Sequence, residues 1–301
     1  MNPLLKKLTS HSLLLSDGAW GTMMQSMGLE PGECPESWNL KYPERIEAIA
    51  KAYIDAGADL VGTNSFGGSR FKLMHYGLQD QVTEINRAAA SISRKAAGPD
   101  RFVMGSVGPT GKMLIMGDVT EDELYEAFKE QVIALEEGGA DAVCIETMTA
   151  LDEGLLAIRA AKENSSLVVI ATMTFDKTVT GEFRTMMGVS PEEMTLVYTE
   201  AGVDILGTNC GNGMANMIPI VEAIRRVNPG IPVLVHANAG LPHYHEGKNV
   251  FDESPGVTAS YVPRLLDAGA NIVGGCCGTT PETIAEIRKK IEEAKHVTSN
   301  Q

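Results

Sequence analysis

Residues 56–65 read AGADLVGTNS, and residues 201–210 repeat this stretch as AGVDILGTNC, 145 positions further along the chain. In each copy an Ala-Gly pair precedes an acidic residue, an apolar run and a Thr-Asn pair, as expected where a helix ends and a short strand follows. The related sequences GGAD at 138–141 and AGAN at 268–271 bring the number of such junctions to four. Shared turn chemistry and descent from a duplicated half-chain both explain the pattern, and the sequence favours neither.

Short apolar runs, each ending in a turn-forming residue, predict eight strands. The runs are continuously apolar rather than alternating, as in parallel strands that helices cover. They span residues 13–18, 58–66, 101–109, 140–148, 167–175, 203–210, 232–240 and 270–278.

The segments between these runs carry helix signals. Residues 43–56 place their apolar side chains on one face, with Pro at the start and Gly just after the end. Thr120 with Glu123, and Ser190 with Glu193, form capping boxes, and Thr280 precedes the last helix. Eight alternating units predict a (β/α)8 TIM barrel, a single domain over residues 1–301 with its active site at the carboxyl ends of the strands. An open doubly wound sheet is the alternative.

The composition excludes several classes of protein. A formal net charge of -14 without a Lys/Arg cluster argues against a nucleic-acid partner. The sequence contains no membrane-spanning apolar run, and the polar residues after Lys6 and Lys7 argue against a signal peptide. Five Cys, an odd number in a large chain, make a secreted disulfide framework a poor explanation. We therefore expect a cytoplasmic protein with reduced thiols and no membrane partner.

Three cysteines end two of the predicted strands. Cys210 ends the sixth strand, and Cys276 and Cys277 end the eighth within the glycine-rich stretch GGCCGTT at 274–280. Glycines allow the backbone to depart from strand geometry, so that both adjacent thiols can reach one point. Three Cys ligands around Zn2+ leave one coordination position open, which is the pattern of catalytic zinc. Cys34 and Cys144 lack a comparable motif, and we expect them to be structural.

Two carboxylates, Asp17 and Glu146, fall at the same rim as the thiols, near the ends of strands one and four. A buried carboxylate needs a cationic partner, which a substrate ammonium group or a structural Arg or Lys could provide. Backbone N–H groups around Ala19 and Trp20 could hold a carboxylate nearby. These features predict an amino-acid site beside a metal centre.

Two further residue types leave alternatives open. His243 and His245 form a His-x-His pair with His236 nearby, as in part of a zinc-hydrolase site, although we expect the pair to lie in a solvated loop beyond the seventh strand. Eight methionines follow predicted strands one, three, five and six, where they either form a flexible docking rim or fill the core. These are Met23, Met24, Met113, Met116, Met186, Met187, Met214 and Met217.

Over nearly its whole length the chain resembles the homocysteine-binding family of S-methyltransferases. The motifs that follow the family in order are DGAWGTMMQ at 17–25, GTNSF at 62–66, VGPTG at 107–111, ET at 146–147, MTFD at 173–176, NC at 209–210, NAG at 238–240 and GGCCGTTP at 274–281. The first of them is closest to the homocysteine module of cobalamin-dependent methionine synthase. His236 and Ala237 precede Asn238, whereas the family usually has Pro directly before this asparagine.

The resemblance implies that Cys210, Cys276 and Cys277 bind zinc and that Asp17 and Glu146 hold homocysteine. Asn238 would supply a weak oxygen ligand in the absence of the thiol. The expected reaction is methylation of the zinc-bound homocysteine thiolate to methionine. The sequence contains no Asp-x-His-x-x-Gly motif that would ligate a corrinoid, so methylcobalamin would be presented by a separate corrinoid protein docked at the barrel mouth. S-methylmethionine or betaine as direct donors, or a zinc-dependent amino-acid-binding subunit without catalysis, are the alternatives.

Overall fold

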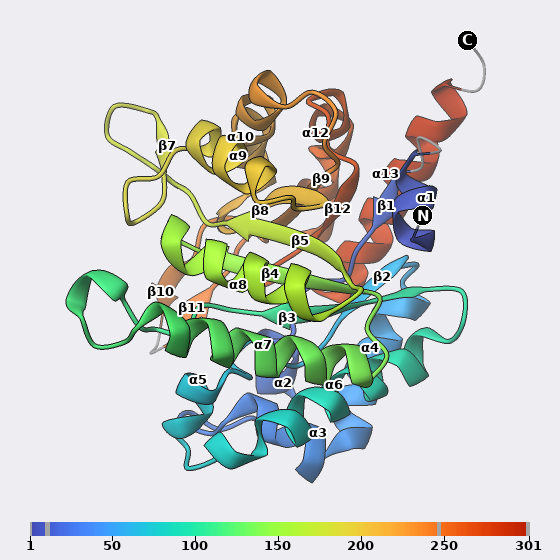
Figure 1. Ribbon diagram of the computed structural model, residues 1–301. Helices are drawn as coiled ribbons and strands as arrows, with labels where there is room; N and C mark the ends of the chain where they lie inside the picture. The colour runs from blue at the N-terminus through green and yellow to red at the C-terminus, as the bar shows by residue number, and fades with distance from the viewer. Residues whose placement is uncertain (1, 10–12, 246–247, 299–301) are drawn as a thin grey trace.

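The computed structural model describes residues 2–9, 13–245 and 248–298, and its centre is a barrel of eight parallel strands (Figure 1). The strands neighbour one another in the order β1, β12, β9, β8, β5, β4, β3 and β2. Their bounds are β1 Leu14–Leu15, β2 Leu60–Gly62, β3 Phe102–Val107, β4 Ala142–Met148, β5 Val168–Met173, β8 Ile205–Gly213, β9 Val233–Asn238 and β12 Ile272–Gly275.

The barrel closes between β1 and β2. On one side β1 pairs in parallel with β12, and on the other the N–H of Asp59 donates to the carbonyl of Leu15 at 2.6 Å. The carboxylate of Asp17 bridges the same gap, because its Oδ2 accepts the N–H of Gly62 at 2.7 Å. The TIM barrel prediction is therefore confirmed, and the alternative of an open sheet is wrong.

Helices surround the strands and connect them in turn (Figure 1). The main connecting helices are α4 Pro43–Asp55, α6 Val82–Ala97, α7 Glu121–Glu137, α8 Leu151–Asn164, α9 Pro191–Glu200, α10 Met214–Val227, α11 Pro255–Ser260, α12 Val262–Asp267 and α13 Pro281–Thr298. Shorter elements in the loops are α2 Gly21–Ser26, α3 Trp38–Lys41, α5 Arg70–Met74 and the 3-10 turns Pro35–Ser37, Gln79–Gln81 and Leu114–Met116. Two hairpins, β6 Asp176–Lys177 with β7 Phe183–Arg184 and β10 His243–His245 with β11 Lys248–Val250, project at the end opposite the termini.

The predicted helix signals act as expected. Both capping boxes form reciprocally, Thr120 with Glu123 before α7 and Ser190 with Glu193 before α9. Helix α4 ends at Asp55, one residue before the predicted end. These local hydrogen bonds fix where the helices begin and hence where each preceding loop must end.

The four junctions found in the sequence share one structure at the amino-terminal end of the barrel. In each, the N–H of an Asp or Asn donates to a carbonyl of the preceding strand segment, and its side chain accepts an N–H of that same segment. A basic side chain from a surrounding helix then binds the Asp or Asn. The four pairs are Asp59 with Arg288, Asp141 with Arg94, Asp204 with Lys162 and Asn271 with Arg225. The repeated sequence thus encodes a shared strand-to-strand clamp.

Inside the barrel an apolar base gives way to a polar layer two residues further along each strand. The base contains Leu60, Cys144 and Leu234, and helix α1 Pro3–Thr9 covers it with Leu4 and Leu8. Because inward positions recur every second residue, the next layer carries the polar and glycine residues that sit below the barrel mouth. These are Ser16, Gly62, Ser106, Glu146, Thr172, Gly207, His236 and Gly274.

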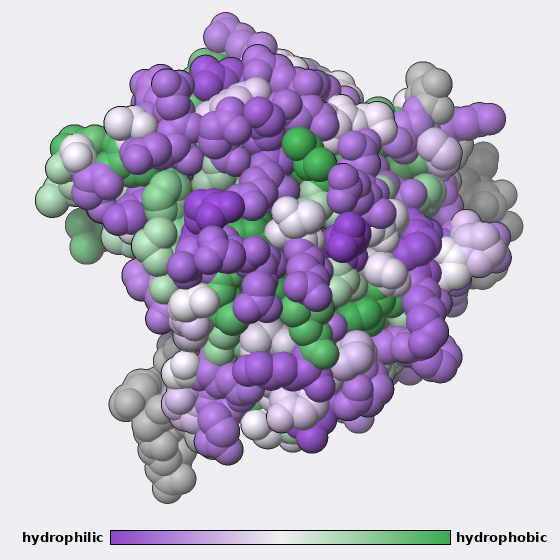
Figure 2. All heavy atoms as spheres, turned by 60° about the horizontal axis from the view of Figure 1, so that its bottom comes forward, coloured by the Kyte–Doolittle hydropathy of each residue, from purple (hydrophilic) through white to green (hydrophobic). Residues whose placement is uncertain are grey.

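On the face shown in Figure 2, hydrophilic side chains predominate and apolar ones form small separate patches. Among the described residues, helices long and apolar enough to cross a lipid bilayer are absent.

Candidate metal centre and adjoining cavity

The three thiols that the sequence singled out converge at the carboxyl end of the barrel. Cys210 lies where β8 shifts its register against β9, and its φ of 59° departs from strand geometry. Strand β12 ends at Gly275, so Cys276 and Cys277 lie in the turn after it. The strand predicted over residues 270–278 is therefore too long at this end. Gly278, with a φ of 80°, completes this turn beside Phe251, which leaves no room for a side chain.

The geometry of the three sulfur atoms suits a tetrahedral metal ion. The Sγ of Cys277 lies 4.0 Å from that of Cys210 and 4.0 Å from that of Cys276, and all three lie within 4.8 Å of one another. Zinc bound to thiolates at about 2.3 Å requires sulfur atoms roughly 3.8 Å apart in a tetrahedron. The donor set therefore fits zinc after small side-chain adjustments.

Hydrogen bonding among the thiols determines which of them ionises first in the metal-free cluster. Hydrogen bonds from Cys276 and Cys277 lower the pKa of Cys210 to about 3. The hydrogen bond to Cys210 is the main cause that raises the pKa of Cys277 to about 12. The hydrogen bond between Cys276 and Cys210 likewise raises the pKa of Cys276. A metal ion that binds all three would require each thiol to give up its proton.

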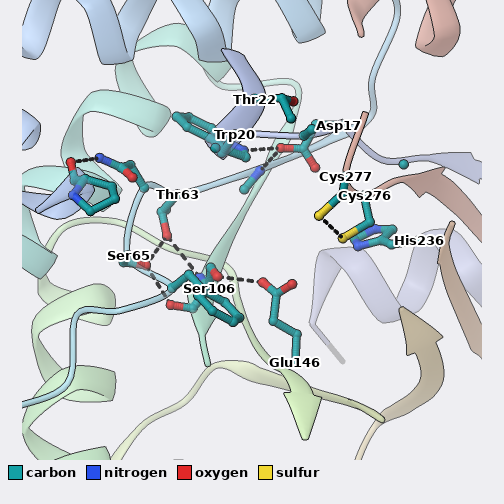
Figure 3. A pocket seen from close by; sticks show the side chains of 18 of the residues that line it. Asp17, Trp20, Thr22, Thr63, Ser65, Ser106, Glu146, His236, Cys276 and Cys277 are labelled. Carbon is teal, nitrogen blue, oxygen red and sulfur yellow. Dashed lines mark hydrogen bonds between the residues drawn. The ribbon is translucent and has the colours of Figure 1, made fainter. Parts of the chain in front are cut away.

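A cavity of about 430 Å³ opens beside the thiols (Figure 3). Its titratable lining residues are Asp17, Glu36, Glu146, His236, Cys210, Cys276 and Cys277. Lys and Arg are absent from the described residues that line it. A cavity with several acidic groups and no protein cation favours a positively charged ligand.

Asp17 and Glu146 both line this cavity, but their surroundings differ. Asp17 is almost fully buried and already accepts three hydrogen bonds, from Trp20 Nε1 at 2.8 Å, Gly62 N at 2.7 Å and Ser16 Oγ at 3.0 Å. Burial raises its pKa above the ordinary value despite these bonds. Asp17 therefore fixes the joint between β1 and β2 as well as facing the cavity.

Glu146 stands on β4 and its carboxylate points into the cavity (Figure 3). Ser106 Oγ donates to its Oε1 at 2.5 Å, and Asn209 Nδ2 lies 3.4 Å from its Oε2. Burial raises the pKa of Glu146 to about 7, and the nearby Asp17 and Cys210 add to this effect, whereas the bond from Ser106 opposes it. At neutral pH this carboxyl group is thus half protonated until a cation binds.

The turn after β1 offers one free backbone N–H fewer than predicted. The N–H of Ala19 donates to Thr279 Oγ1 at 3.1 Å, so it is not free to bind a ligand carboxylate. The N–H groups of Trp20 and Gly21, at the start of α2, have no acceptor among the described residues. Thr279 Oγ1 also donates to the carbonyl of Cys276 at 2.7 Å, which ties this turn to the cysteine turn.

Two buried polar side chains near the thiols lack partners in the described structure. Asn238 Oδ1 accepts no hydrogen bond, although the Asn238 amide contributes to lowering the pKa of Cys210. His236 Nε2 is also without a partner, and burial lowers the pKa of its imidazole to about 4. His236 lies on β9 in the polar layer beside Gly274.

The other histidines and the methionines divide between surface and core. His243 pairs with Asp252 at 3.2 Å in the exposed β10–β11 hairpin, and the side chain of His245 lies outside the described part of the structure. Among the described residues, the three thiols form the one group of at least three potential ligands within 4.8 Å. Met24, Met214 and Met217 are buried in the core, Met23 is half-buried, and Met113, Met116, Met186 and Met187 are exposed.

Several cavity residues escaped the sequence analysis. Glu36 is buried in the cavity wall, where it accepts the N–H of Gly67 at 2.7 Å and the thiol of Cys34 at 3.4 Å. Burial and the Glu36 charge raise the pKa of Cys34 to about 12. Ser106 and Asn209 form hydrogen bonds to Glu146, and the strand alternation around Glu146 was the signal that could have identified them.

A family model described as homocysteine S-methyltransferase matches residues 14–291. Curated relatives include methionine synthase from Mycobacterium tuberculosis, 31% identical over 97% of this chain and 26% of its own length. The methionine synthase from Mycobacterium leprae is also 31% identical, over 94% of this chain and 24% of its own length. The chain thus spans about a quarter of the length of these relatives.

Solved structures support the barrel fold independently. The metallated form of the homocysteine methyltransferase MmuM from Escherichia coli superposes with a TM-score of 0.78 at 23% sequence identity. The match covers 96% of this chain and 100% of that structure.

Proposed function

Because the chain belongs to the homocysteine S-methyltransferase family, we propose that it binds homocysteine in this cavity and transfers a methyl group to its sulfur, forming methionine. The observation that carries the proposal is the placement of three converging thiols beside two buried carboxylates in one cavity. A small amino acid that carries both a thiol and an ammonium group matches the two ends of this arrangement.

The substrate ammonium binds between Asp17 and Glu146. Both carboxylates face the cavity, and no protein cation among the described lining residues neutralises them. The free N–H groups of Trp20 and Gly21 are placed to bind the substrate carboxylate, while Ala19 contributes the backbone of the same turn. Trp20 also orients Asp17 through its indole N–H.

Cys210, Cys276 and Cys277 hold the zinc ion. When bound, zinc lowers the pKa of a coordinated thiol and so supplies a thiolate nucleophile at neutral pH. With zinc bound, the homocysteine thiol would be held as a thiolate, and its sulfur would attack the methyl carbon of the donor in line with the breaking bond. The electron pair of that bond remains with the donor. Before substrate arrives, the unpartnered Asn238 Oδ1 is available as a weak fourth ligand.

The proposed donor is a methylcorrinoid carried by a protein module other than this barrel. Support comes from the relatives named methionine synthase, of which the chain spans only a part. The exposed Met113, Met116, Met186 and Met187 follow strands at the cavity end of the barrel and provide apolar, adaptable surface for docking. S-methylmethionine or betaine would instead react without a partner, and a binding subunit would bind homocysteine without turnover.

A donor comparison tests the proposal. Zinc-loaded protein is incubated with homocysteine and, in separate reactions, methylcobalamin, methyltetrahydrofolate, S-methylmethionine or betaine, and methionine is measured. We expect methionine from methylcobalamin. Turnover with S-methylmethionine or betaine alone would replace the donor assignment, and homocysteine binding without turnover on any donor would contradict the catalytic function.

A further inference from the structure

Two non-glycine residues of the described chain adopt a left-handed backbone, and both lie at the proposed site. Thr147 has a φ of 61° and Cys210 a φ of 59°. Each falls where a strand shifts register, between Ile145 and Met148 on β4 and between Asn209 and Gly213 on β8. A residue with a Cβ atom avoids this conformation unless its surroundings hold it.

The side chain of Asn209 holds Thr147. Its Oδ1 accepts the N–H of Thr147 at 2.8 Å and the hydroxyl of Thr172 at 2.6 Å. Its Nδ2 donates to Thr147 Oγ1 at 2.7 Å and faces Glu146 Oε2 at 3.4 Å. Asn209 is fully buried, so the two donors and two acceptors of its amide are all engaged with protein groups.

The same residue is joined directly to Cys210. The carbonyl of Asn209 accepts the hydroxyl of Thr174 at 2.8 Å, which fixes the peptide that leads into the left-handed cysteine. Asn209 therefore touches the carboxylate of Glu146 through its side chain and aims the thiol of Cys210 through its backbone. A Ser or Asp side chain could not replace it, because neither supplies two donors and two acceptors at this reach.

We propose that Asn209 is a positioning residue that sets the distance and orientation between Glu146 and Cys210. This inference rests on the proposed function, in which Glu146 binds the substrate ammonium and Cys210 binds zinc. Both ends of the bound amino acid then depend on Asn209, because the side-chain bonds to Thr147 and Thr172 also hold the Asn209 backbone that leads into Cys210. Loss of that side chain weakens substrate binding and metal binding together, although Asn209 contacts neither ligand.

The first variant is Asn209→Ala. It leaves the N–H of the half-buried Thr147 without its acceptor, so that the left-handed turn relaxes and Glu146 moves with it. We expect homocysteine to bind the zinc-loaded variant about tenfold more weakly by calorimetry, the effect of losing one such buried contact. Zinc affinity, measured by chelator competition without substrate, should also fall. Asn271→Ala, at the opposite end of the barrel, is the matched control and should change neither affinity.

Substitution of Thr147 by glycine distinguishes a positioning role of Asn209 from a general loss of structure. Glycine adopts a positive φ without steric cost, so Thr147→Gly in the Asn209→Ala background should restore most of the homocysteine affinity. A structural role alone predicts the reverse, since glycine adds chain entropy and weakens the site further.

Unchanged homocysteine and zinc affinities in Asn209→Ala would overturn the inference, as would a double variant that binds homocysteine more weakly than Asn209→Ala. A wild-type protein that binds zinc but not homocysteine would contradict the proposed function instead. In that case the zinc affinity of Asn209→Ala still tests whether Asn209 positions Cys210.

Discussion

Homocysteine binding should depend on pH through Glu146, and Glu146→Gln isolates this dependence. The ammonium group of the substrate binds the carboxylate form. Because burial raises the pKa of Glu146 to about 7, the substrate-free carboxyl group must lose a proton before it can bind the cation at lower pH. The glutamine variant has no such proton, so its homocysteine affinity lacks this contribution to the pH dependence.

The size of the effect follows from the pKa. At pH 6 a group with a pKa near 7 is about nine-tenths protonated, whereas at pH 8 it is about nine-tenths ionised. The Glu146 contribution to wild-type affinity should therefore weaken about tenfold from pH 8 to pH 6. Loss of a charge-assisted hydrogen bond of about 1.5–3 kcal/mol makes the variant roughly 10- to 100-fold weaker at pH 8. At pH 6 the two proteins should differ much less.

Calorimetry of both zinc-loaded proteins at pH 6, 7 and 8 measures this effect. The homocysteine thiol also loses a proton on binding, which steepens the pH dependence of both proteins equally. The informative quantity is thus the ratio of the two dissociation constants, which should rise about tenfold between pH 6 and pH 8. A ratio that stays constant across this range would refute the assignment of the ammonium to Glu146.

Two other predictions concern the amino-terminal clamps and the docking surface. Arg288→Ala removes a partly buried ion pair with Asp59 at 2.7 Å and should lower the free energy of unfolding in urea by about 2 kcal/mol. Substitution of the exposed Lys289 by Ala should change the free energy of unfolding by less than about 0.5 kcal/mol. Homocysteine affinity should be unchanged in both variants. Equal stabilities of the Arg288→Ala and Lys289→Ala variants would contradict the clamp. Met116→Asp and Met186→Asp should slow methyl transfer from a corrinoid protein at least fivefold, because both side chains are exposed where the partner would dock. The rate of methyl transfer from free methylcobalamin should not change. Equal slowing with both donors would contradict docking at these residues.

The fold was predictable because local signals agree with one another. The sequence placed all eight strands, both capping boxes and the start of the last helix, and periodicity alone identified the buried face of α4. Strand ends were less predictable. β1 covers only Leu14–Leu15, although main-chain hydrogen bonds to β12 continue through Ser16 and Asp17, and β8 runs on to Gly213 through a register shift that no apolar pattern reveals.

The candidate site was predictable as a set of residues but not as a geometry. Glycines around Cys276 and Cys277 indicated a departure from strand structure, and the two thiols do lie in a turn. Nothing in the sequence marks Thr147 as left-handed, since that conformation depends on Asn209 from a distant strand. The loss of Ala19 as a free donor has the same origin, because Thr279 reaches it across 260 residues.

Zinc content tests the central claim most directly. Metal analysis of the purified wild-type protein and of Cys210→Ala, Cys276→Ala and Cys277→Ala should give one zinc ion per wild-type chain and none in the three variants. Cys144→Ala, which alters a buried thiol in the apolar base of the barrel, is the control and should retain zinc. Full zinc occupancy in any of the three variants would contradict the proposed metal centre.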